Sequence, residues 1–203
     1  MYAYLFPGQG SQEVGMGSNL YDTFPAARAI FDQADQILDM SISDLCFNGP
    51  AETLDDTAIT QPAIFTTSIA ALRALQALDF PSPTYVAGHS LGEFSALVAA
   101  DVLSFEDGLN VVQERGRLMK QAGEQSPGGM GAIIALSRED VESICATVRE
   151  QTGEYVGVAN DNCPGQIVIS GSTTALEQAL ALANENGARK TVKLAVSIAC
   201  HSP

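Results

Sequence analysis

The stretch that decides the fold is residues 85–92, YVAGHSLG, in which the pentapeptide GHSLG follows a short apolar run. A helix-like run, residues 91–100, comes directly after it. A G-x-S-x-G sequence between a strand and a helix is typical of a nucleophile elbow, a sharp turn that exposes the serine hydroxyl. Glycines on both sides of Ser90 keep side chains from colliding where the backbone bends. The stretch therefore predicts an α/β fold in which Ser90 forms acyl esters.

Hydrophobic spacing on both sides of this turn predicts alternating strands and helices. The expected elements are, in order, a strand at 2–6, helices at 24–38 and 60–78, the strand and helix around Ser90, and a helix at 104–122. Ser104 is the expected N-cap of the last helix, and Pro62 suits the first turn of the second. Residues 39–56 form an acidic stretch that is expected to be loop-rich. This alternation indicates an α/β fold with a parallel sheet.

A Pro-Gly-Gly run at residues 127–129 is the clearest internal boundary. Beyond it, the pattern predicts a strand, a helix, two strands, a helix and a strand, at 130–136, 139–151, 155–159, 166–170, 174–186 and 191–194. This β-α-β-β-α-β order is that of a ferredoxin-like unit. We therefore predict a discontinuous core of residues 1–125 and 195–203, and an inserted small subdomain of residues 126–194.

Composition narrows the classes of function. The 203 residues are 46% hydrophobic, enough for a sizeable core, and carry a formal net charge of −14, which disfavours nucleic acid and anionic membranes as partners. Apolar runs are too short to span a bilayer, and the N-terminus has no targeting pattern, so a cytoplasmic protein is expected. Four widely spaced cysteines and two histidines offer no zinc-type ligand set, so no metal is expected. No cofactor is expected either.

A serine nucleophile needs a general base and donors for the oxyanion. His89 adjoins Ser90 in the elbow, so its side chain is expected to point away from the hydroxyl, which leaves His201 as the predicted base. An acid to orient His201 cannot be chosen among 24 carboxylates. The backbone N–H of Leu91 is one expected oxyanion donor, and the glycine-containing loop at 7–10 is the expected source of the other.

Arg115 is the candidate residue for binding an anion. It lies on the flank of an apolar helical stripe formed by Leu109, Val112, Gly116 and Met119, so its side chain can face partly inward. A buried guanidinium needs an anionic partner, which in an acyl-transfer site would be a substrate carboxylate held by two parallel hydrogen bonds. An exposed helix arginine is the alternative interpretation.

Taken together, these residues resemble the malonyl-CoA:acyl carrier protein transacylases, enzymes of fatty-acid synthesis that are also embedded in polyketide synthases. The matching motifs, in the family's order, are FPGQGSQ at 6–12, TQPA at 60–63, GHSLGE at 88–93, the Arg115-Gly116 pair, PGGM at 127–130, NDNCPGQIVISG at 160–171 and CHSP at 200–203. They span the chain from end to end. The resemblance implies an α/β-hydrolase-like core with an inserted ferredoxin-like subdomain.

The resemblance also implies the reaction and the role of each site residue. A malonyl group would pass from malonyl-CoA to Ser90, and from Ser90 to the phosphopantetheine thiol of acyl carrier protein, with His201 as base. Backbone N–H groups of Gln9 and Leu91 would bind the oxyanion, and Arg115 would hold the malonyl carboxylate. The matching motifs add as candidate pocket residues Gln61, His89, Asn160, Asn162 and Cys200.

Acyl carrier proteins are acidic, as is this chain, so their attraction requires a local basic patch. Arg189, Lys190 and Lys193 are the candidates for that patch, and a monomer is expected.

The chain departs from the family in two places. Cys200 stands where many members carry phenylalanine, which leaves the choice between malonyl and methylmalonyl groups open. The chain also stops two residues after His201, so the C-terminal part of the core, with a carbonyl that orients the histidine, is expected to be absent.

Two other functions remain open at this point. A serine esterase or thioesterase could use the same elbow, with water in place of the carrier thiol. A fragment that ends so soon after His201 could instead bind carrier protein or CoA without turnover.

Overall fold

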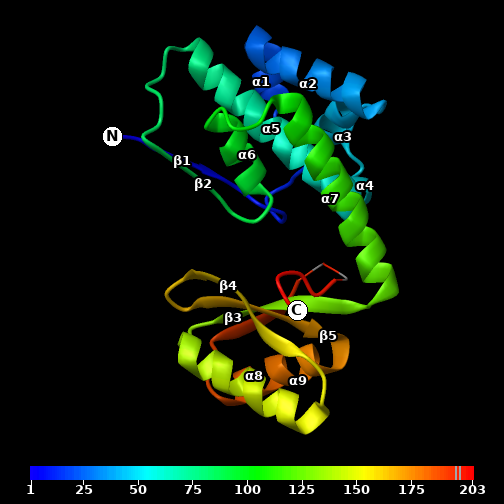
Figure 1. Ribbon diagram of the computed structural model, residues 1–203, viewed down its shortest axis with the longest axis vertical. Helices are drawn as coiled ribbons and strands as arrows, with labels where there is room; N and C mark the ends of the chain where they lie inside the picture. The colour runs from blue at the N-terminus through cyan, green and yellow to red at the C-terminus, as the bar shows by residue number, and fades with distance from the viewer. Residues whose placement is uncertain (195, 197) are drawn as a thin grey trace. The chain divides into compact units, whose positions relative to one another are not determined.

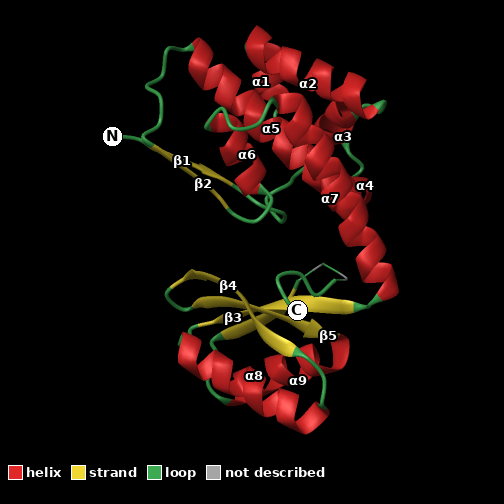
Figure 2. Ribbon diagram, viewed as in Figure 1, coloured by secondary structure: helices red, strands yellow, loops and turns green. Residues whose placement is uncertain are grey.

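The predicted nucleophile elbow lies in the first of two units into which the chain divides, Met1–Leu118 and Met119–Pro203 (Figure 1). The computed structural model describes residues 1–194, 196 and 198–203. Figure 2 shows that the first unit consists mostly of helices around two strands, whereas the second is a sheet with helices on one face. The chain therefore combines helices with both parallel and antiparallel strands, as an α/β protein does.

Two parallel strands position the elbow in the first unit. β1 (Ala3–Phe6) pairs with β2 (Tyr85–Gly88), and their last residues, Phe6 and Gly88, are partners in the register. Since the strands are parallel, the loop that follows β1 and the turn that follows β2 leave the sheet at the same edge. Helix α6 (Gly92–Ala99) begins directly after the turn and packs against both strands.

The helical part of the first unit supplies its hydrophobic core. Its remaining helices are α1 (Ser18–Thr23), α2 (Pro25–Leu38), α3 (Ile42–Asn48), α4 (Ala51–Leu54), α5 (Thr57–Ala77) and the start of α7 (Phe105–Gln125). Helix α5 is buried on most of its surface because the other helices surround it, and Phe65 and Ile69 are fully buried. The predicted helix at 24–38 is confirmed within one residue.

Two local predictions were wrong. Helix α5 begins at Thr57 rather than at residue 60, because the Asp56 side chain accepts the backbone N–H of Ala58 at 3.0 Å and caps the helix earlier. Pro62 therefore lies inside α5 and not in its first turn. The stretch at 39–56 is not mainly loop, since α3 and α4 lie within it and bury a few apolar side chains against the core.

The second unit contains one antiparallel sheet. Its elements are, in order, β3 (Gly128–Ile134), α8 (Arg138–Thr152), β4 (Val156–Cys163), β5 (Gln166–Ser172), α9 (Thr173–Glu185) and β6 (Lys190–Lys193). The strands lie in the order β4-β5-β3-β6. Helices α8 and α9 bury Val141 and Leu176 in one core with Ile133, Ile167 and Ile169 of the sheet.

The division into units differs from the predicted domain limits. The boundary between the units falls within α7, and residues 195–203 group with the second unit. Ala195 and Ser197 of the predicted return segment lie outside the described residues. The assignment of 195–203 to a discontinuous core thus stays a prediction. No helix in the described part of the chain is both long and apolar enough to cross a membrane.

Candidate active site

Close backbone packing builds the turn around Ser90. Ser90 has a φ of 52°, a left-handed conformation that is unusual for a residue with a side chain. A Cβ atom on Gly88 would lie 1.9 Å from the carbonyl carbon of Gly92, and one on Gly92 would lie 2.2 Å from the carbonyl oxygen of Phe6. Both positions therefore require glycine. The His89 N–H donates to the Phe6 carbonyl at 3.0 Å and ties the turn to β1.

The loop that follows β1 lies directly against this turn. A Cβ atom on Gly8 would be 2.5 Å from the His89 carbonyl oxygen and 2.8 Å from its Nδ1, so the His89 imidazole lies over Gly8. Among the described residues, no acceptor is assigned to the backbone N–H of either Gln9 or Leu91. The structure thus brings the two predicted donors to the same edge of the sheet, with both N–H groups available to a ligand.

Arg115 of α7 reaches the nucleophile. Its Nη2 donates to Ser90 Oγ at 2.9 Å, and its Nη1 donates to the Gln61 amide oxygen at 2.5 Å. The guanidinium carbon also lies 5.9 Å from the centroid of the Phe94 ring. The half-buried Arg115 side chain therefore faces Ser90. A substrate group attached to Ser90 would lie next to the positive charge of the guanidinium.

Side-chain amides connect Arg115 to the loop after β1. Gln61 is fully buried, and its Nε2 donates to the amide oxygen of Gln9 at 3.3 Å. Gln9 Nε2 donates in turn to Thr57 Oγ1 at 3.1 Å. Sequence reasoning missed Thr57 because it placed the start of α5 at residue 60. With the correct start, Thr57 and Gln61 are four residues apart on one face of α5.

The other predicted site residues belong to the second unit. His201 and Cys200 follow the last strand, whereas Asn160 and Asn162 lie on β4. Their approach to Ser90 stays a prediction. No cluster of three metal-ligating side chains occurs in the described ranges, 1–194, 196 and 198–203.

The three residues of the predicted basic patch differ in their surroundings. Arg189 and Lys190 are exposed at the start of β6, which is an edge strand. The Lys193 ammonium pairs with Glu177 of α9 at 2.7 Å. Lys190 and Lys193 are three residues apart on a strand and hence point to opposite faces of the sheet.

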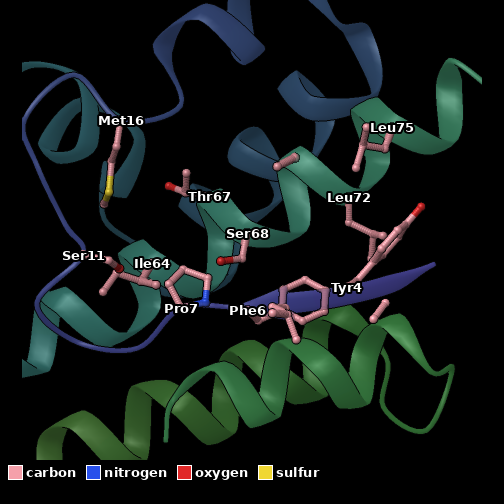
Figure 3. Close-up of a pocket in the computed structure, with 13 residues that line it drawn as sticks. Tyr4, Phe6, Pro7, Ser11, Met16, Ile64, Thr67, Ser68, Leu72 and Leu75 are labelled. Carbon is pink, nitrogen blue, oxygen red and sulfur yellow. The ribbon is translucent and has the colours of Figure 1, made fainter. Parts of the chain in front are cut away.

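The first unit also contains a cavity that Ser90 and Arg115 do not line. It has a volume of about 470 Å³ and lies between β1 and α5, with Tyr4, Phe6, Ile64 and Leu72 among its mostly apolar lining (Figure 3). Pro7, Ser11 and Met16, from the loop between β1 and α1 that also carries Gln9, contribute to its lining. The cavity lining includes neither Ser90 nor Arg115, so we do not place the reaction there.

Comparison with known proteins decides the family. The model of the acyl transferase domain matches residues 3–203. The chain belongs to the acyl transferase domain family. One curated relative is the malonyl CoA-acyl carrier protein transacylase of Bacillus subtilis (strain 168). It is 48% identical to this chain over 200 residues, which cover 98% of this chain and 62% of the relative.

Solved structures agree with the family. The malonyl CoA-acyl carrier protein transacylase from Coxiella burnetii superposes with a TM-score of 0.96 at 42% identity, over 100% of this chain and 63% of that one. A malonyl-transacylase solved in complex with its type II PKS acyl-carrier protein gives a TM-score of 0.93 at 39% identity, over 98% and 63% of the two chains. The acyl transferase domain thus spans somewhat less than two thirds of the length of these relatives.

Proposed function

We propose that this acyl transferase domain moves a malonyl group from malonyl-CoA to the phosphopantetheine thiol of an acyl carrier protein in fatty-acid biosynthesis. The observation that carries the proposal is the hydrogen bond from Arg115 Nη2 to Ser90 Oγ at 2.9 Å. In a malonyl ester of Ser90, only a carbonyl and a methylene separate Oγ from the free carboxylate. A guanidinium at this distance can therefore hold that carboxylate, and an unsubstituted acetyl group would gain nothing from it. The names of the relatives support the same substrates.

In the proposed first half-reaction, Ser90 Oγ attacks the thioester carbonyl of malonyl-CoA, and His201 takes the hydroxyl proton. The negative oxygen of the tetrahedral intermediate receives hydrogen bonds from the backbone N–H groups of Gln9 and Leu91. The intermediate collapses, the carbon–sulfur bond breaks, and the CoA thiolate takes the proton from His201. The products are CoA and a malonyl ester on Ser90.

In the second half-reaction, the phosphopantetheine thiol takes the place of CoA. His201 accepts the thiol proton as the sulfur attacks the ester carbonyl, and it returns this proton to Ser90 Oγ when the ester bond breaks. Gln61, His89, Asn160, Asn162 and Cys200 would line the pocket. The pairing with acyl carrier protein is supported by the solved complex of a related malonyl-transacylase with its carrier protein.

The architecture that we propose follows the same family pattern. The parallel strands β1 and β2 with the elbow would belong to an α/β-hydrolase-like core, and the antiparallel order β4-β5-β3-β6 supports a ferredoxin-like subdomain inserted in it. We assign Arg189 and Lys190 to a carrier-protein contact, since both are exposed. Lys193 is a weaker candidate because it already pairs with Glu177. We also propose that the domain acts as a monomer and that it is located in the cytoplasm.

The proposal is tested by following CoA release from malonyl-CoA with and without the phosphopantetheine-bearing carrier protein. A transferase releases one equivalent of CoA without the carrier and continues only when the carrier is added, with malonyl-carrier as product. Steady release of CoA and free malonate without the carrier would instead identify a thioesterase. No release in either mixture would identify a non-catalytic fragment.

A further inference from the structure

We propose that Thr57 is a positioning residue for the acylation of Ser90. Its hydroxyl and the Gln61 side chain together hold the primary amide of Gln9, one group at each end, at 3.1 Å and 3.3 Å. Through this side chain they fix the loop that carries the Gln9 backbone N–H. The inference rests on the proposed function for the use of that N–H as an oxyanion donor and for the contact of Arg115 with the substrate.

Arg115 determines which group donates and which accepts in the hydrogen bonds that run through Gln61 and Gln9 to Thr57. A guanidinium can only donate, so Gln61 must present its amide oxygen to Arg115 and its NH2 group to Gln9. Gln9 accepts with its oxygen and therefore presents its own NH2 group to an acceptor, which is Thr57 Oγ1. A hydroxyl oxygen can accept this bond, whereas a methyl group in its place cannot. The cation that contacts Ser90 and the loop beside Ser90 are thus joined through Gln61 and Gln9.

The first turn of α5, which carries Thr57, is itself held in place by two contacts. Asp56 caps the helix at Ala58, which fixes the backbone where Thr57 begins the helix. Helix α7 packs against the same turn at Gly116, where a Cβ atom would lie 2.9 Å from the Thr57 carbonyl oxygen. Because Gly116 follows Arg115 directly, the same contact sets the distance from α7 to α5 and the reach of Arg115 to Gln61.

The loop needs such an anchor because its backbone is permissive. Gly8 and Gly10 flank Gln9, and Gly10 has a φ of 101°, which glycine adopts at little cost. A second anchor, from Gln12 Nε2 to Asp55 Oδ1 at 2.8 Å, is exposed to solvent. The Thr57 contact is the half-buried one, and it acts on the residue whose N–H is to be placed.

The test compares three variants of the purified protein. Thr57→Val removes the acceptor and keeps the shape, Thr57→Ser keeps the acceptor, and Thr67→Val is the matched control, because Thr67 is a half-buried threonine on the same helix and outside the network. Formation of the malonyl adduct is measured against malonyl-CoA concentration by rapid quench and intact mass. Labelling by a fluorophosphonate probe reports the reactivity of Ser90 toward a reagent without a malonyl group.

We expect Thr57→Val to lower the acylation rate at saturating malonyl-CoA, and the rate of probe labelling, by roughly 3- to 10-fold, the usual effect of one neutral hydrogen bond. The half-saturating concentration should change less than about twofold, since the Arg115 contact with substrate is retained. Thr57→Ser should restore both rates, and Thr67→Val should leave them at the wild-type level with a similar melting temperature. A merely structural role would not produce this split between rate and half-saturation together with rescue by serine.

The possible failures are distinguishable. If Thr57→Val reacts like the wild type with both reagents, the positioning role is wrong and the proposed function stands. If the wild type reacts with the probe but not with malonyl-CoA, the proposed function is wrong, and the probe rates alone decide the role of Thr57. Equal losses in Thr57→Val and Thr57→Ser would also overturn the inference, because the acceptor would then not matter.

Discussion

If the proposed function is right, replacement of Arg115 by alanine should lower malonyl transfer strongly and reduce the preference for malonyl over acetyl groups. The substitution removes a guanidinium whose Nη2 lies 2.9 Å from Ser90 Oγ, and with it the proposed partner of the malonyl carboxylate. Leaving a carboxylate unpaired in a half-buried site costs about 2–5 kcal/mol. At about 1.4 kcal/mol per factor of ten, malonyl transfer should fall by roughly 30-fold to several thousand-fold. Acetyl transfer has no carboxylate to lose and should fall much less.

The assay measures Ser90 acylation by malonyl-CoA and by acetyl-CoA in parallel, so that the ratio of the two rates reports the carboxylate contact. Arg117→Ala is the matched control, since Arg117 lies on the same helix but pairs at the surface with Glu114 at 2.7 Å. Exposed pairs of this kind contribute little, so its ratio should stay at the wild-type value. An unchanged malonyl-to-acetyl ratio in Arg115→Ala, or the same change in both variants, would refute the assigned role.

Three further predictions concern other parts of the chain. Gly92→Ala places a Cβ atom 2.2 Å from a backbone oxygen and should lower the free energy of unfolding by at least about 1–3 kcal/mol; an unchanged urea midpoint would contradict this. Burial raises the pKa of Cys46 to about 12, so iodoacetamide at about pH 8 should modify exposed Cys163 in the native protein and Cys46 only after unfolding, as peptide mapping would show. Arg189→Glu with Lys190→Glu should raise KM for carrier protein and leave malonyl loading unchanged; equal effects on both half-reactions would exclude the patch.

The sequence predicts the elbow well because its determinants are local. A strand, a G-x-S-x-G turn and a helix follow one another without a gap, and the glycines are required by contacts within a few residues or with the neighbouring strand. The helix at 24–38 is equally predictable, since its apolar residues repeat at helical spacing over four turns. The proximity of the loop at 7–12 to Ser90 follows from the parallel pairing of β1 and β2.

What the sequence did not predict depends on competition between local signals or on distant contacts. At the start of α5, the proline preference for the first turn pointed to residue 60, but the Asp56 cap prevailed and placed Thr57 on the helix. Helices α3 and α4 are too short for their periodicity to stand out in an acidic segment. The network through Gln9, Gln61 and Arg115 joins residues about 50 positions apart, which no local pattern encodes. The predicted pairing of Ser90 with His201 is of the same long-range kind and stays a prediction.

The central claim is that Ser90 carries the malonyl group between two thiols. The most direct measurement is the intact mass of the protein after brief exposure to malonyl-CoA, followed by peptide mapping and by addition of the carrier protein. The account predicts a gain of one malonyl group, located on Ser90, absent in Ser90→Ala, and lost to the carrier thiol when carrier protein is added. No mass gain, or an adduct that survives Ser90→Ala, would contradict it.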